Sequence, residues 1–93
     1  MARMARWEEL EESALSGDEI AAFELAMCHA SGSSGLGMDL VQAHRWFNVA
    51  SARGYAPAGT WRTEIAAEMS AVEIVAAQKL ARSTLAVPTR RMA

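Results

Sequence analysis

A glycine- and serine-rich break separates two alanine-rich helical patterns in the first half of the chain. The break, SGSSGLG at residues 31–37, holds three glycines and three serines, a composition that does not sustain a helix. Small residues lie on both sides of it and at its start, where two helices would touch closely: Ala21, Ala26, Gly32, Ala43 and Ala50. Residues 21–54 therefore predict a helix–loop–helix unit. Such a unit buries its apolar side only by packing against neighbouring helices.

The spacing of apolar residues predicts five helices and no strand along the whole chain. We expect them at about residues 4–15, 19–30, 40–53, 57–69 and 71–84, with Gly17 and Gly54 ending the first and third. Asp18 and Asp39 are suited to be N-caps, and Gln42 completes a capping-box pattern after Asp39. The fold class expected is all-α, a short α/α solenoid of about five antiparallel helices.

The last two predicted helices also carry start signals. Pro57 is tolerated in a first helical turn, and Ser70 with Glu73 forms a capping box. In the final helix, which we interpret as a C-terminal cap, Val72, Ala76 and Leu80 are expected to face inward, flanked by Ile74, Ala77 and Ala81. Residues 1–85 would thus form a single domain, followed at residues 86–93 by a basic tail without helical periodicity, for which we expect disorder when it is unbound.

The composition of the chain limits the classes of function that it can have. A chain of 93 residues that is 52% hydrophobic can build one core, and its net charge of −2 gives no general attraction to nucleic acid. The single cysteine, Cys28, forms no internal disulfide, and no apolar run approaches the roughly 20 residues of a membrane span. The N-terminus lacks the apolar stretch of a secretory signal. We therefore expect a cytoplasmic protein that inserts in no membrane.

The helix–loop–helix unit resembles a Sel-one-like repeat, a relative of the tetratricopeptide repeats. The resemblance covers about 34 residues, with Ala26 and His29 where the family usually has a glycine and a tyrosine, and with a loop one residue longer. It implies a protein-interaction scaffold without catalytic residues or cofactor. The residues that carry it are Ala21, Leu25, Gly32, Gly35, Asp39, Ala43, Trp46, Phe47, Ala50 and Gly54.

No constellation of residues for metal or covalent chemistry stands out. The two histidines, His29 and His44, are 15 residues apart on different predicted helices, so we expect them to be partly exposed and not metal ligands. A nucleophilic Cys28 would need a nearby base and an electropositive pocket, whereas Glu24, four residues before it, would disfavour the thiolate, so we expect a packed thiol. Glu64 and Glu68 are four residues apart, as paired carboxylates can be, but nothing beside them supports an enzyme.

The candidate protein-binding residues come from the resemblance and from charge. In stacked helical hairpins the first helices line the concave surface, which brings in Glu24, His29, Trp61 and Arg62 as candidates. Trp46 is expected to pack between helices. Trp61 is the better candidate for partial exposure, but Ala58 and Ile65 share its face, which favours a structural role for the ring over a binding role. The tail adds Arg90 and Arg91 as further candidates.

Charge is divided unevenly between the two ends. Six of the eleven acidic residues lie within residues 8–19, while residues 79–93 hold four basic residues and no acid. Two hypotheses follow. The chain is a non-catalytic adaptor or accessory subunit that binds another protein, or it is a structural subunit that assembles with itself or completes a complex, as a possible homo-oligomer.

Overall fold

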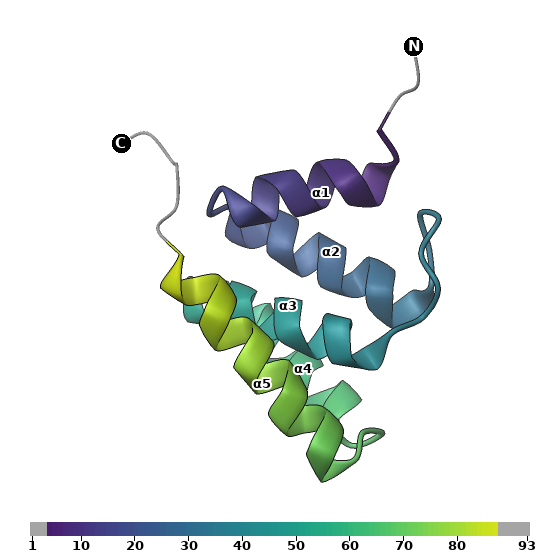
Figure 1. The fold of residues 1–93 in the computed structure, drawn as a ribbon, viewed down its shortest axis with the longest axis vertical. Coiled ribbons are helices and arrows are strands. Elements are labelled where there is room, and N and C mark those ends of the chain that lie inside the picture. Colours follow the sequence, from purple (N-terminus) through teal and green to yellow (C-terminus); the bar gives the residue numbers. More distant parts are fainter. Residues whose placement is uncertain (1–3, 88–93) are drawn as a thin grey trace.

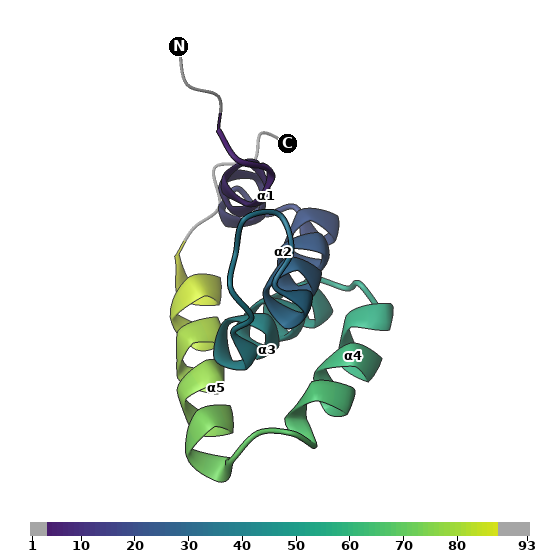
Figure 2. The same ribbon diagram turned by 90° about the vertical axis from the view of Figure 1, so that its right-hand side faces the viewer.

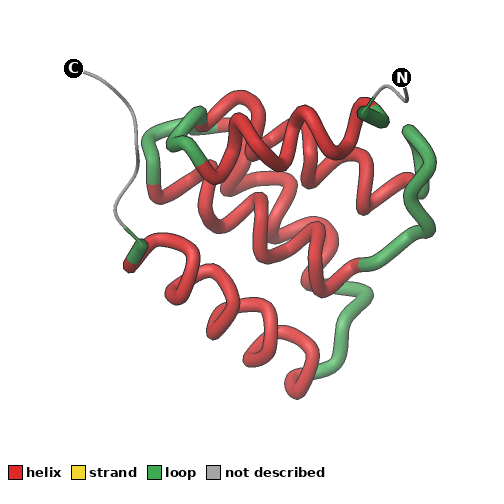
Figure 3. Tube along the Cα trace, turned by 45° about the horizontal axis from the view of Figure 1, so that its top comes forward, coloured by secondary structure: helices red, strands yellow, loops and turns green. Residues whose placement is uncertain are grey.

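The computed structural model describes residues 4–87 and places five helices in them (Figure 1). They are α1 (Arg6–Leu15), α2 (Glu19–Ser31), α3 (Leu40–Ala52), α4 (Pro57–Ala66) and α5 (Ala71–Ala86). Residues 4–87 contain no strand, so the all-α expectation is confirmed for this part of the chain (Figure 3). None of these helices combines the length and the apolar character that crossing a bilayer requires.

The caps of α2, α3 and α5 follow the sequence signals, with one exception. The Asp18 carboxylate accepts from the backbone N–H groups of Ile20 and Ala21, at 2.9 and 3.1 Å. Asp39 accepts from the N–H of Gln42 at 3.1 Å, but the side-chain oxygen of Gln42 accepts from Arg45 Nη1 and does not reach back to Asp39. The capping box predicted after Asp39 is therefore wrong, because the arginine one turn later competes for that oxygen.

The loop between α2 and α3 is held by the backbone at both of its ends. Gly32 has a φ of 72°, and its N–H donates to the Cys28 carbonyl at 2.8 Å. At the other end the N–H of Asp39 donates to the His29 carbonyl at 2.9 Å. These bonds satisfy carbonyls that the end of α2 leaves free, and they bring the start of α3 back alongside α2.

α3 is the central helix of the described structure. It contacts α2, α4 and α5, whereas α1 packs mainly on α2. Figure 2 shows α4 and α5 on opposite sides of α3, diverging from each other. The main core is made of α1–α4 residues with Ala81 of α5, and Trp46, Phe47, Leu25 and Val49 are its largest fully buried side chains. Alanines fill most other core positions, which lets the helix backbones approach closely.

The inward face of α5 is centred on Ala77 and Ala81, which the sequence placed only at its flank. Val72 is 79% exposed, and the buried residues of α5 are Ala77, Ala81 and Thr84. The reason lies in α3: the Arg45 guanidinium donates to the Thr84 hydroxyl from Nε and Nη2, at 3.1 and 2.9 Å. Two small residues and a hydroxyl thus face α3 in place of a valine. α5 also continues to Ala86, two residues beyond the predicted end, and α1 begins at Arg6 and not at Met4.

Two valines provide a matched test of this packing. Val49→Ala should lower the free energy of unfolding by about 2–3 kcal/mol, because it removes buried methyl groups and leaves a cavity. Val72→Ala, the same change at an exposed position, should stay within about 0.5 kcal/mol of the wild type. Urea denaturation followed by circular dichroism gives both values. Equal losses at the two positions would contradict the orientation of α5.

A second matched pair, two glycine-to-alanine substitutions, tests the backbone conformation of the α2–α3 loop. Gly32 adopts the left-handed conformation, and a Cβ added to it would lie 3.1 Å from the backbone nitrogen of Met38. Gly32→Ala should therefore cost at least about 1–2 kcal/mol of stability. Gly59 lies inside α4, where an added Cβ would make an ordinary 3.5 Å contact with Ser51 Oγ. Gly59→Ala should therefore stabilise the protein by about 0.5–1 kcal/mol. Melting temperatures that fall for both variants would refute this contrast.

Candidate interaction surface

Four aromatic rings, which we call the aromatic cluster, join α2, α3 and α4: Phe23, Phe47, Tyr55 and Trp61. The ring centroids of Phe23 lie 5.6 Å from Phe47 and 4.9 Å from Tyr55, and Phe47 stacks on Trp61 at 6.3 Å with 14° between the planes. These distances fall in the range of attractive ring contacts. Phe47 is fully buried, while Trp61 remains 42% exposed. The cluster thus connects the core to the surface.

The exposed edge of the cluster continues into a positioned charge on the same helix. Arg62 follows Trp61 in α4, and its Nη1 donates to the side-chain oxygen of Asn48 in α3 at 2.8 Å. A neutral acceptor holds the guanidinium and leaves its charge unopposed, with no carboxylate within 4.0 Å of it among residues 4–87. Trp61 and Arg62, neighbours in the sequence, are thus each held against α3, one by ring stacking on Phe47 and one by a hydrogen bond to Asn48.

Glu24 lies in α2 and faces α1. Its Oε2 forms an ion pair with Arg6 Nη2 at 2.7 Å, and both side chains are about half exposed. Such a pair stabilises a protein by at most about 1 kcal/mol, so a partner could replace it at little cost. Glu24 is accessible, but nothing in the described contacts joins it to Trp61. Arg90 and Arg91 lie outside the described residues.

Both histidines are buried, which corrects the expectation of partly exposed side chains. His29 is 8% exposed and His44 is 3% exposed, and each has an Nδ1 without a hydrogen-bond partner in the described part of the chain. Burial lowers the pKa of His29 below its ordinary value, although Asp39 and Glu11 oppose the shift. Burial, with a smaller effect of Arg62, also lowers the pKa of His44. Both are thus held neutral in the fold, and His29 presents little surface to a partner.

Cys28 is buried as expected, and its Sγ lies 3.6 Å from Ser34 Oγ. Within residues 4–87 no three histidine, cysteine or carboxylate side chains gather as metal ligands do. Glu64 and Glu68 are both exposed.

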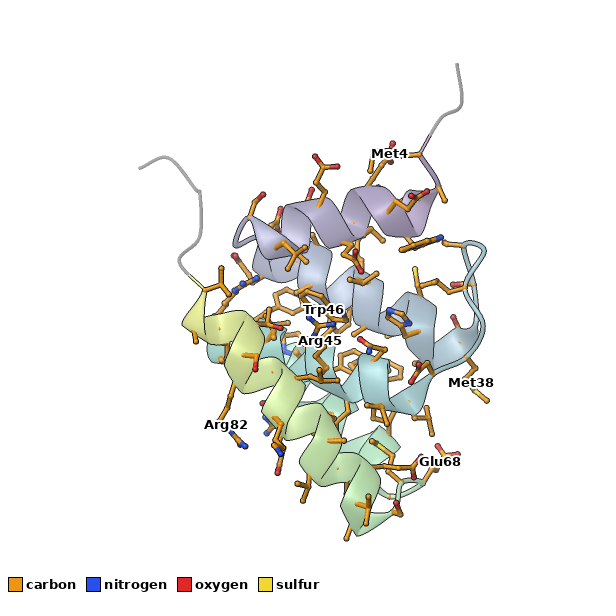
Figure 4. The ribbon with its side chains drawn as sticks, in the orientation of Figure 1. Met4, Met38, Arg45, Trp46, Glu68 and Arg82 are labelled. Atoms are coloured by element: carbon orange, nitrogen blue, oxygen red, sulfur yellow. The ribbon has the colours of Figure 1, made fainter. Side chains whose placement is uncertain are left out.

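Two features of the surface were not singled out from the sequence. One is Arg45, whose guanidinium lies 4.5 Å from the centroid of the Trp46 ring, a cation–π contact (Figure 4). The other is an open pocket of about 430 Å³ lined by Glu9, Glu12, Ser13, Ser16 and Asp18, where the acidic side of α1 meets the start of α2. The acidic run was visible in the sequence. The position of Arg45 depends on α5, which lies far along the chain.

No model of a known protein family matches the sequence, and no significant match is found among curated proteins.

The buried histidines predict a loss of stability at mildly acidic pH. Because the folded state lowers their pKa values, the unfolded state binds more protons once the pH falls below about 6.5. Stability should therefore be full above about pH 7 and decrease as the pH falls toward 5.5, by at most about 1.4 kcal/mol per pH unit for each histidine. Urea midpoints at pH 7.5, 6.5 and 5.5 measure this. His44→Phe should flatten the dependence, and an unchanged slope in that variant would exclude His44 as a source.

Proposed function

We propose that this protein is a non-catalytic interaction module that binds another protein, as an adaptor or accessory subunit, through a surface centred on Trp61 and Arg62. One observation carries the proposal: a half-exposed tryptophan is stacked on the buried Phe47, next to an arginine held by Asn48. Tryptophan and arginine are the residue types most enriched where binding energy concentrates. A ring fixed by stacking also loses little conformational entropy when a partner covers it.

We further propose that the helices form a short antiparallel solenoid similar to Sel-one-like repeats, with α2 and α3 as the complete unit. The support is the residue pattern at positions 21–54 together with the neighbours of that unit, α1 on α2 and α4 on α3. In this arrangement α2 and α4 are first helices, and the aromatic cluster links them through Phe47 of α3. A cytoplasmic location is part of the same proposal, and it rests on the single buried cysteine.

A second candidate function is self-assembly or completion of a larger complex. The observation that favours it is the contrast between two surfaces. α1 carries Glu8, Glu9, Glu11 and Glu12, whereas α5 exposes Val72 and Val75 beside Lys79 and Arg82. A head-to-tail contact between such unlike surfaces would join copies of the chain.

Affinity purification of the tagged protein from its native cells distinguishes the two functions. A partner recovered near 1:1 with wild type should be lost with Trp61→Ala and with Arg62→Glu. If these two residues carry most of the binding energy, each substitution should lower the affinity about 30-fold or more, which corresponds to about 2 kcal/mol. Circular dichroism of each variant checks that the fold is retained.

Arg82→Glu tests the other proposed contact surface, because Arg82 is exposed on the outer side of α5 and points away from the molecule (Figure 4). If Arg82→Glu removes the partner and the α4 variants do not, the binding surface lies elsewhere. Recovery of the bait alone, as a defined oligomer that dissociates in high salt, would favour self-assembly.

A further inference from the structure

A second pocket lies away from the aromatic cluster, where the end of α1 and the end of α5 meet α3. Its volume is about 680 Å³ and it is open to solvent. Leu15 and Val87 give it apolar walls, and both are at least half exposed. Its polar lining includes Glu12, Ser16, Arg45 and Thr84. The pocket therefore combines apolar contact area with a cation set between helices.

Arg45 is bound by neutral groups alone within residues 4–87. Nε and Nη2 donate to Thr84 Oγ1, at 3.1 and 2.9 Å, and Nη1 donates to Gln42 Oε1 at 3.0 Å. A guanidinium has five N–H donors, so three are used, and one on Nη1 and one on Nη2 have no acceptor in the described structure. Two terminal N–H groups are the arrangement that binds a carboxylate in bidentate fashion.

The charge of Arg45 is also left unbalanced. No carboxylate of the described chain lies within 4.0 Å of it, and its partial burial lowers its pKa, against a weaker opposing effect of Glu11. The ring of Trp46 lies 4.5 Å from the guanidinium carbon and fixes its position. A partly buried guanidinium that is already oriented gains more binding free energy from an anion than a fully solvated arginine does.

We propose that this pocket binds a carboxylate group, with Arg45 as its anchor and Leu15 and Val87 contacting the apolar part of the ligand. The source of the carboxylate is an acidic side chain of a peptide segment or the terminus of a chain. Glu12 on the rim favours ligands that carry a positive charge beside the carboxylate. The site is separate from Trp61 and Arg62, so a ligand here would leave the proposed protein-binding surface free.

NMR titration tests the proposal on the full chain. In ¹⁵N-labelled protein, butyrate added at constant ionic strength should shift the Arg45 Nε–H and Trp46 Nε1–H signals along saturable curves. Butyramide, which has the same shape without the charge, should leave them in place. The Arg82 Nε–H signal serves as the internal control for general anion effects. Shifts that are linear, or equal at Arg45 and Arg82, would overturn the proposal.

Two variants separate binding from folding. Arg45→Gln should abolish saturation, but it also removes the contacts to Trp46 and Thr84, so its fold has to be checked by circular dichroism. Leu15→Glu changes a half-exposed side chain at the pocket wall and should weaken butyrate binding at least about twofold by repulsion, with circular dichroism again checking the fold. Unchanged affinity in Leu15→Glu would contradict the site.

Two blocked peptides identify the source of the carboxylate. Acetyl-Ala-Glu-Ala-amide offers only a side-chain carboxylate, and acetyl-Ala-Ala-Ala with a free terminus offers only a main-chain carboxylate. Saturable shifts of Arg45 with either peptide support the site and assign its source. If both peptides fail to shift Arg45, the pocket does not bind peptide carboxylates and the proposal is wrong.

Discussion

The enclosure of α3 is the constraint on which the rest of the structure depends. A helix of 13 residues is marginal on its own in water, so α3 exists because its neighbours remove its side chains from solvent. Trp46, Phe47 and Val49 supply the apolar area, and the alanines beside them let the neighbouring helices come close. The two proposed binding regions both derive from α3. Phe47 supports Trp61 on one side, and Arg45 reaches Thr84 on the other.

Local signals in the sequence predicted the elements well, because each acts within a few residues. Asp18 and Asp39 cap α2 and α3, Pro57 begins α4, and the glycine–serine break becomes the loop before α3. The orientation of α5 could not be predicted in the same way. Its apolar residues are spread around most of the helix, so the pattern favoured the neighbouring face of Val72, Ala76 and Leu80. The observed face packs on α3 through Ala77 and Ala81, with the bond from Arg45 to Thr84, 39 residues later in the chain, at its end.

The candidate surface was predictable only in part, for the same reason. The exposure of Trp61 followed from its polar neighbours, and the structure adds the stacking on Phe47 that makes it rigid. The histidines looked like surface residues because histidine often is one. His44 is nevertheless buried on α3, a helix with neighbours on several sides. Which polar residue becomes buried depends on long-range packing, and periodicity in one helix does not contain that information.

The contact of α5 with α3, which skips the intervening α4, bears on how the chain folds. α1, α2 and α3 each meet the helix next to them in the chain, so their contacts close short loops. The bond between Arg45 and Thr84 instead closes a loop that contains all of α4. Contacts that are distant in sequence form late, because chain entropy opposes them until other parts are in place. We therefore expect the wall that α5 gives to the Arg45 pocket to form after the contacts between adjacent helices.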